Sequence, residues 1–165
     1  MTKAVQKPVV YLETSFVSHL AGQDLGDPAQ LAKHEKSVAW LRRMEGKVTP
    51  VVSEVVLTEI SDGPADGAAR RMGVVSGLPV WVADAKARAL ARELLHNGGV
   101  KMSKPDDALH IAVASAGGAD VLLSWNFKDI VNERKLPLIK SVVERAGCRC
   151  PQLVSPDKPL LEDLP

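Results

Sequence analysis

The chain is poor in the residues that would assign it to several common classes of protein. Its 165 residues include only two cysteines, Cys148 and Cys150, which are separated by a single residue. This spacing is poor geometry for a disulfide within a strand, and two thiolates are too few for a zinc site. We therefore expect both cysteines to be reduced and to have no structural or catalytic role.

Net charge and long apolar runs are also scarce. The formal net charge is +1, so the chain lacks the overall positive field of many DNA-binding modules, and any contact with nucleic acid must be local. The N-terminal residues MTKAVQKPVVYLE contain no run long enough for a signal peptide, and no later run approaches the ~20 apolar residues of a membrane span. We expect a soluble, cytoplasmic protein.

The sequence does contain enough apolar material for one core. Hydrophobic residues make up 45% of the chain, and its length fits a single domain. Short aliphatic runs alternate with amphipathic stretches, which predicts a layered α/β domain with a largely parallel sheet. We assign residues 1–150 to this domain, and we expect the proline-rich residues 151–165 to be a surface tail with at most a short edge strand.

Local signals predict where the elements lie. Strands are expected at 9–12, 48–52, 79–82 and 121–123, and helices are expected to begin near residues 14, 28, 54, 67, 85, 104 and 138. The proline in the strand at 48–52 favours an edge position or a connection. Thr14 or Ser15 should cap the first helix, and Ser103 with Asp106 has the pattern of a capping box.

Acidic or amide side chains stand where strands end and helices begin. Glu13 follows the first strand, Asp107 lies in the first turn of the helix near 104, and Asn126 follows the strand at 121–123. Ligands of open α/β sheets bind at the carboxyl ends of the strands, so these three residues belong to one candidate site. A single Glu after a strand is more often a solvated turn residue, so the case for Glu13 depends on the other two. Convergence of carboxylates from separate segments indicates a divalent cation.

Two neighbouring pairs of acids have to be told apart. Glu54 lies at a helix start, where its charge suits the positive end of the helix dipole, whereas Glu59 has less structural reason to be acidic. Asp106 completes the capping box, which leaves Asp107 without that task. We therefore favour functional roles for Glu59 and Asp107, and structural roles for Glu54 and Asp106.

The succession YLETSFVSHL, SEVVLTEI and DALHIAVASAGGADVLLSWNFKDI resembles PIN-domain ribonucleases of the VapC type, the toxin half of bacterial toxin–antitoxin pairs. The match covers most of residues 9–147, and the pairing of DALHIA with LLSWN is fairly specific. The resemblance implies a three-layer α/β/α domain with a central, mainly parallel sheet. It also implies a metal-dependent endoribonuclease with an RNA substrate, an antitoxin partner and a homodimeric state.

The resemblance also assigns a metal site. Its Mg²⁺ or Mn²⁺ ligands and catalytic positions correspond to Glu13, Glu59, Asp107 and Asn126, with Asp129 as a fifth candidate ligand. Most members have Asp in place of Glu13, although a subgroup with a Y-L-E-T-S start is closer, and Asn126 is neutral where Asp is frequent. One tightly held metal, with a second recruited by the substrate, therefore fits better than two stable metals.

The chemistry of these side chains agrees with such an enzyme. Phosphodiester hydrolysis needs an activated water and a shield for negative charge, and a carboxylate-held Mg²⁺ supplies both. Mg²⁺ prefers oxygen ligands and keeps several waters, so a few carboxylates suffice. Without a cation, repulsion among three carboxylates should raise at least one pKa.

Other residues near the predicted site have a structural and a functional interpretation. His110 could be a base but is expected to pack at the helix–sheet junction, and Trp125 could stack on a base but is expected in the core. Hydroxyls that could hold metal-bound waters, or act only as caps, belong to Thr14, Ser15 and Ser124. Side chains that could contact RNA, or simply lie on solvated faces, are Lys101, Lys104, Lys128, Arg70 and Arg71.

Two other functions remain open. One is a catalytically silent PIN-like RNA-binding module, motivated by Glu13, Asn126 and the near-neutral charge. The other is a small-molecule phosphohydrolase with an aspartyl nucleophile, although Glu13 occupies the place where that chemistry needs Asp. The apolar residues at 16–20 and 38–44 are the candidate surface for an antitoxin or a second copy of the chain, or are simply core.

Overall fold

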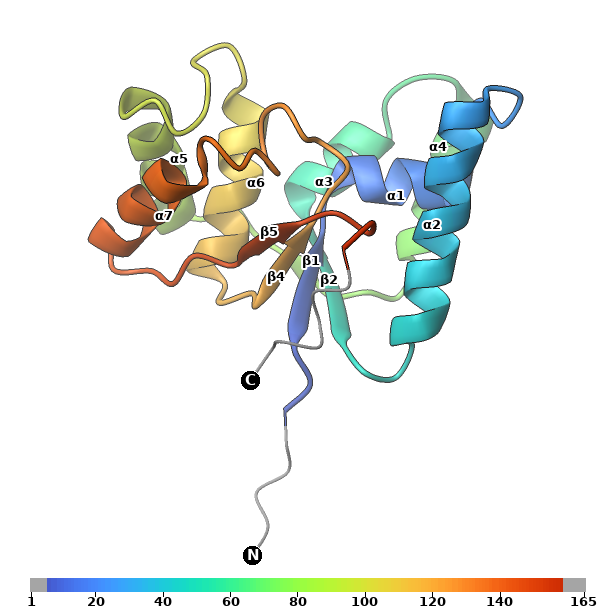
Figure 1. Cartoon of the computed structure of the whole chain (residues 1–165), viewed down its shortest axis with the longest axis horizontal. Helices are drawn as coiled ribbons and strands as arrows, with labels where there is room; N and C mark the ends of the chain where they lie inside the picture. The colour runs from blue at the N-terminus through green and yellow to red at the C-terminus, as the bar shows by residue number, and fades with distance from the viewer. Residues whose placement is uncertain (1–5, 159–165) are drawn as a thin grey trace, which may run out of the picture.

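A five-stranded sheet lies between two groups of helices in the computed structural model, which describes residues 6–158 (Figure 1). The elements in chain order are β1 (Val9–Leu12), α1 (Thr14–Ala21), α2 (Pro28–Met44), β2 (Thr49–Ser53), α3 (Glu54–Ile60), α4 (Ala65–Val75), β3 (Val80–Trp81), α5 (Ala85–His96), α6 (Pro105–Ala116), β4 (Val121–Leu123), α7 (Leu136–Arg145) and β5 (Gln152–Val154). Helices α5, α6 and α7 lie on one side of the sheet, and α1, α2 and α4 on the other (Figure 1). The predicted three-layer α/β/α architecture is confirmed.

The strand order places a topological switch point beside β1. All pairs in the sheet are parallel, and the order is β3-β2-β1-β4-β5. The chain therefore winds outward from β1 to β3 in one direction and then crosses to β4 and β5 in the other. Such a reversal opens a crevice at the carboxyl ends of the two central strands, here β1 and β4.

Strand β2 is an interior strand, although its proline favoured an edge. Pro50 pairs in register with Val10 of β1. The backbone N–H groups of successive residues in a strand point toward opposite neighbouring strands. Thr49 donates its N–H to the Pro8 carbonyl, on the side of β1, so the backbone nitrogen of Pro50 is directed toward β3. The short β3 pairs with β2 only at Val52 and Ser53, so the absent N–H of Pro50 removes no ladder hydrogen bond.

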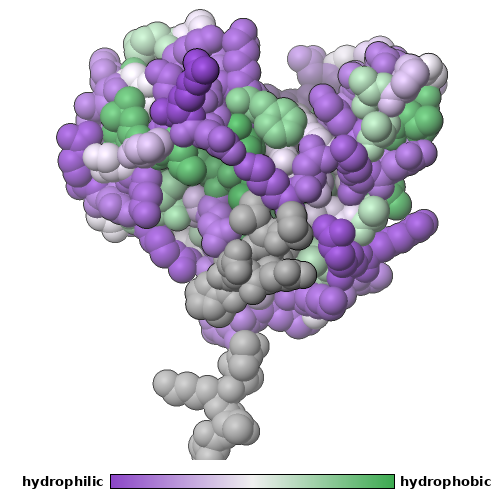
Figure 2. Space-filling view, viewed as in Figure 1, coloured by the Kyte–Doolittle hydropathy of each residue, from purple (hydrophilic) through white to green (hydrophobic). Residues whose placement is uncertain are grey.

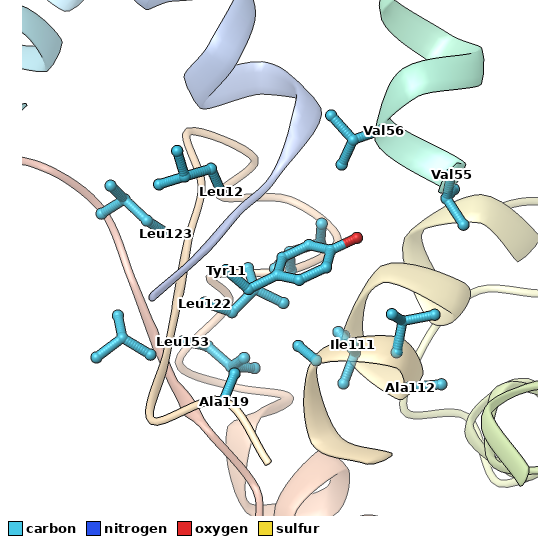
Figure 3. Close-up of a cluster of buried hydrophobic side chains, with 14 of the residues drawn as sticks. Tyr11, Leu12, Val55, Val56, Ile111, Ala112, Ala119, Leu122, Leu123 and Leu153 are labelled. Atoms are coloured by element: carbon cyan, nitrogen blue, oxygen red, sulfur yellow. The ribbon is translucent and has the colours of Figure 1, made fainter. Parts of the chain in front are cut away.

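The core is formed by aliphatic side chains of the sheet and of the facing helices. Figure 3 shows Tyr11 among them, with Leu122 and Ile111 nearby and its hydroxyl directed toward the start of α3. Trp125 is only 5% exposed, and its Nε1 donates a hydrogen bond to Ser37 Oγ at 2.8 Å. The expectation that Trp125 belongs to the core is confirmed.

Two predicted helix caps are wrong. Helix α1 is capped by Glu13, whose side chain accepts a hydrogen bond from the Ser15 N–H, and not by Thr14 or Ser15. The capping box of Ser103 and Asp106 does not form, because the N-cap of α6 is Lys104, which makes no side-chain cap hydrogen bond. Proline is favoured at the first helical position, so Pro105 fixes the helix start one residue later than the pattern indicated.

The C-terminal segment contributes an edge strand. β5 pairs in parallel with β4 and is the short edge strand that the expectation for residues 151–165 allowed, with Leu153 and Val154 buried against the sheet. The last helix begins at Leu136, two residues before the predicted start. Residues 159–165 lie outside the described part.

Cys148 and Cys150 are free thiols, as expected. Within the described residues, no helix has the length and apolarity that a bilayer span requires.

Packing at the end of α6 depends on a glycine. A Cβ added at Gly117 would lie 2.3 Å from the ring of Trp81 in β3, whereas a Cβ at Gly73 in α4 would meet nothing within 4 Å. We predict that Gly117→Ala lowers the free energy of unfolding by about 1–3 kcal/mol through overpacking. Gly73→Ala is the matched control and should raise it by about 0.5–1 kcal/mol. Chemical denaturation measures both, and equal effects of the two variants would contradict the packing described here.

Candidate active site

Glu13 is positioned by the register of β1 and β4. Leu12 pairs with Leu123, and the Glu13 N–H donates to the Leu123 carbonyl at 3.1 Å, which brings Glu13 beside Ser124 at the carboxyl ends of both strands. Glu13 is 4% exposed, and its Oε2 accepts hydrogen bonds from Ser124 Oγ at 2.8 Å, from the Ser15 N–H at 2.9 Å and from Ser15 Oγ. These donors make the burial of this carboxylate tolerable.

Glu59 belongs to a second hydrogen-bonded group. Its Oε1 accepts from Thr14 Oγ1 at 2.8 Å and is hydrogen-bonded to Nε2 of the fully buried His110. On the other side of the imidazole, Nδ1 lies 2.7 Å from the Tyr11 hydroxyl, which lies 2.6 Å from Ser53 Oγ. The network therefore links β1, α3 and α6 through hydrogen bonds among Tyr11, Glu59 and His110.

His110 and Glu59 behave as an ion pair. Burial alone would lower the pKa of His110, but its hydrogen bond to Glu59 and the negative charges of Glu13, Glu59 and Asp107 raise it above the ordinary value. Burial likewise opposes ionisation of Glu59, yet the hydrogen bond and charge of His110 lower the pKa of Glu59 below its usual value. When the imidazole is protonated, both of its nitrogens donate, and Nδ1–H then donates to the Tyr11 hydroxyl.

Asp107 is the carboxylate whose charge is least well balanced. Burial and the nearby charges of Glu13, Asp129 and Glu59 raise its pKa to about 6, and His110 offsets only part of this effect. The side chain is half-buried, whereas its neighbour Asp106 is exposed. The expectation that repulsion would raise the pKa of at least one acid is therefore confirmed for Asp107.

The loop after β4 gives different positions to Asn126 and Asp129. Asn126 Oδ1 accepts a hydrogen bond from the Asp129 N–H at 3.0 Å, and its carbonyl accepts from the N–H groups of Ile130 and Val131 at 3.2 and 2.8 Å. Asn126 thus organises the turn that follows it. Asp129 is 9% exposed and acts electrostatically on Asp107, so the loop contributes its negative charge to the cluster through Asp129.

The remaining charged candidates have structural contacts. Glu54 accepts a hydrogen bond from the Ala83 N–H at 2.8 Å and lies 4.0 Å from Arg88, so it links α3 to the start of α5. Arg71 donates to the carbonyls of Ile60 and Asp62 at the end of α3. Other basic side chains considered as RNA contacts are exposed, namely Lys101, Lys104, Lys128 and Arg70.

The order of these elements matches a known family. A family model described as PIN domain matches residues 10–127, which is more than half of the chain and includes Glu13, Glu59, Asp107 and Asn126. The chain belongs to the PIN-domain family. The predicted family membership is therefore confirmed, and Asp129 lies just beyond the matched residues.

A solved structure has a similar fold. The crystal structure of VapBC2 from Rickettsia felis bound to a DNA fragment from their promoter contains a chain that is 19% identical to this PIN domain, with a TM-score of 0.54. The comparison covers 73% of this chain and 89% of that chain. At this identity, the likeness shows the fold alone. A search of curated proteins finds no match.

The acids of this PIN domain do not form a ready-made metal cage. Among the described residues, no group of three or more His, Cys, Asp or Glu side chains is arranged to hold a metal ion. Glu13 and Glu59 instead accept hydrogen bonds from protein donors. The oxygen atoms of these acids nevertheless suit Mg²⁺ or Mn²⁺, which prefer oxygen ligands. The negative charges of the acids around Asp107 also favour a cation there. The metal and its ligands stay predictions.

The sequence did not indicate the role of Tyr11. His110 packs at the helix–sheet junction as expected, but its pairing with Glu59 and Tyr11 was not predicted. A signal existed in the spacing: Tyr11 and Glu13 are two residues apart in an extended segment and so face the same side, and His110 follows Asp107 by three residues of a helix. The side chains that surround the site thus come from the same two short motifs as its acids.

The raised pKa of Asp107 makes the stability of the metal-free protein depend on pH. Between about pH 4 and 6 the folded state holds a proton on Asp107 that the unfolded state has lost, so the free energy of unfolding falls as pH rises through this window. We predict that Asp107→Asn removes this contribution and that its melting temperature exceeds that of the wild type increasingly from pH 4 to 6. Thermal melts in EDTA measure this, with Asp106→Asn as the control for lost charge in the first turn of α6. A gap that does not change with pH would contradict it.

Proposed function

We propose that this PIN domain is a metal-dependent endoribonuclease, a hydrolase of RNA phosphodiester bonds that acts as a VapC-type toxin. The observation that supports this most directly is the gathering of carboxylates at the switch point between β1 and β4. Burial, together with the negative charges of Glu13, Asp129 and Glu59, raises the pKa of Asp107 to about 6. Uncompensated acids are unfavourable for folding, so their presence at the crevice of the sheet argues for a bound cation.

The proposed site assigns a task to each acid. Glu13, Asp107 and Asp129 would hold Mg²⁺ or Mn²⁺, with Glu59 and Asn126 completing the set predicted from the family resemblance. When bound, such an ion lowers the pKa of a water ligand and shields negative charge on the phosphate. His110 keeps Glu59 ionised by pairing with it, and Ser15 and Ser124 fix the carboxylate of Glu13.

The proposed partners follow from the same comparison. The similar chain occurs in a VapBC2 structure bound to promoter DNA, which supports an antitoxin partner for this protein. We also propose a homodimer and a cytoplasmic location. Phe16 and Val17 of α1 are fully buried, whereas Leu31 and Leu41 of α2 are each 37% exposed. Helix α2 is therefore the better candidate for a contact surface.

One observation favours the alternative of a silent RNA-binding module. The carboxylate oxygens of Glu13 and Glu59 accept hydrogen bonds from serine, threonine and histidine, and Asn126 is neutral and bonded within its own loop. Such a site could retain its shape without cleaving RNA. Activity measurements separate the two functions.

The nuclease proposal predicts cleavage of RNA that requires the acidic cluster. Purified protein with a structured RNA and Mn²⁺ should give discrete fragments, and Asp107→Asn and Asp129→Asn should each lower the rate at least about 100-fold, because each removes charge that orients the ion. Asp106→Asn should stay close to the wild type, since Asp106 is exposed and outside the cluster. Binding without any cleavage would favour the silent module.

Metal binding should depend on pH without any assay of activity. A divalent cation competes with the proton on Asp107, whose pKa is about 6, so binding should be weak below that pH and strong above it. We predict that millimolar Mn²⁺ raises the melting temperature more at pH 7.5 than at pH 5. Asp107→Asn should abolish most of this increase. An equal increase at both pH values would show that the cation binds elsewhere.

A further inference from the structure

Phe127 is exposed in a chain that buries its other aromatic side chains. Of the six aromatic residues, all of which lie in the described part, Tyr11, Phe16, Trp40 and Trp125 are buried and Trp81 is half-buried, whereas Phe127 is 46% exposed. Burying a phenyl side chain stabilises a fold by about 1.5–3 kcal/mol, so its exposure brings no benefit to folding. Phe127 follows Asn126 and precedes the buried acid Asp129 by two residues, so it lies on the loop that carries part of the site.

The ring of Phe127 belongs to an aromatic and basic cluster. It packs edge-on against Trp125, with ring centroids 6.1 Å apart, and Lys33 Nζ lies 5.9 Å from the centroid of the Trp125 ring. His19 of α1 packs against the same indole, also at 6.1 Å. Lys128, which follows Phe127, is exposed. The cluster therefore offers an exposed ring that packs on an indole contacted by Lys33, with the exposed Lys128 next in sequence, in a protein whose net charge is only +1.

The loop holds this ring in a fixed place relative to Glu13. The Phe127 N–H donates to the Trp125 carbonyl at 3.1 Å, and the Asn126 N–H donates to Ser124 Oγ at 2.9 Å. Ser124 Oγ in turn donates to Glu13 Oε2 at 2.8 Å. The backbone that carries the ring therefore needs little further ordering, and preorganisation of this kind lowers the cost of binding.

We propose that Phe127 is a stacking platform for an unpaired base of single-stranded RNA, with Lys33 and Lys128 contacting the phosphates on either side. Aromatic rings next to a basic groove bind single strands in this manner, because every base has a stacking face. Because Phe127 and Asp129 lie two residues apart on the same loop, we assign the stacked base to a nucleotide next to the cleaved phosphate. This inference rests on the proposed nuclease function and adds to it that the substrate is unpaired at this position.

A protein partner explains the same ring less well. Stable protein interfaces bury on the order of 1,200–2,000 Å² and have an apolar centre, whereas the sequence neighbours of Phe127 are the amide Asn126 and the exposed Lys128. Figure 2 shows a hollow in the surface between the two groups of helices, with hydrophilic and hydrophobic side chains at its edges. A charged polymer with flat apolar bases fits such surroundings.

The experiment measures RNA binding separately from cleavage. Binding of a fluorescent single-stranded RNA and of its duplex is measured in the Asp107→Asn background, where RNA stays intact, and KM is measured in the active protein. We expect Phe127→Leu to weaken single-strand binding about 5- to 150-fold, the range expected for one lost stacking contact, and to raise KM. Phe127→Tyr keeps the stacking face, so its single-strand binding and its KM should stay close to the wild-type values. Val82→Ala, at a residue that is 65% exposed away from the loop, is the control and should change neither.

The outcomes distinguish this proposal from the nuclease proposal. Equal single-strand binding by Phe127→Leu and Phe127→Tyr in a protein that cleaves RNA would overturn the platform alone. Equal weakening of duplex and single-strand binding would also overturn it. Single-strand binding that depends on Phe127 without cleavage by the wild type would support the platform and overturn the nuclease. Loss of a co-purified protein partner from Phe127→Leu, with RNA binding intact, would assign the ring to a protein contact.

Discussion

The parallel pairing of β1 with β4 is the constraint on which the site depends. It reverses the winding of the sheet between these strands, and its register sets Glu13 beside Ser124. Helix α1 then starts directly from Glu13, so the carboxylate serves as the N-cap and also faces the crevice. A slip of one residue in this register would turn Glu13 to the opposite face and break both arrangements.

Negative charge gathered at this crevice is balanced at two of its acids and left unbalanced at a third. Glu13 is stabilised by hydroxyl and amide donors, and Glu59 is stabilised by the buried charge of His110. Asp107 has no comparable partner, and its pKa rises accordingly. The unfavourable electrostatic energy of the cluster therefore falls mainly on Asp107, in the first turn of α6. That is where a proton or a cation gains most by binding.

The sequence predicted the fold better than it predicted the details of the site. The alternation of apolar runs and amphipathic stretches was sufficient for the three layers, and most element starts were placed within two residues. The cap of α1 was wrong because glutamate is a rare cap, and only the sharp turn after β1 brings the Glu13 carboxylate back to the Ser15 N–H. The pairing of His110 with Glu59 joins residues 51 positions apart, and no local pattern reveals such a contact. The sequence allowed β5 only as a short edge strand without bounds, because its few apolar residues stand among prolines and are buried by pairing with β4.

The same pairing explains how a glutamate fits at position 13, where an aspartate would be one methylene shorter. The extra methylene lets the carboxylate of Glu13 fold back to the start of α1, where the Ser15 N–H and the positive end of the helix dipole favour its negative charge. A shorter side chain would leave the Ser124 hydroxyl, 2.8 Å from Oε2, without this acceptor. Because Ser124 Oγ also accepts from the Asn126 N–H, one hydroxyl links residue 13 to the start of the loop that carries Phe127 and Asp129. Ser15 adds a second link, since it donates to Glu13 and accepts from the Trp125 N–H, so the first acid and the loop after β4 are coupled through two serines.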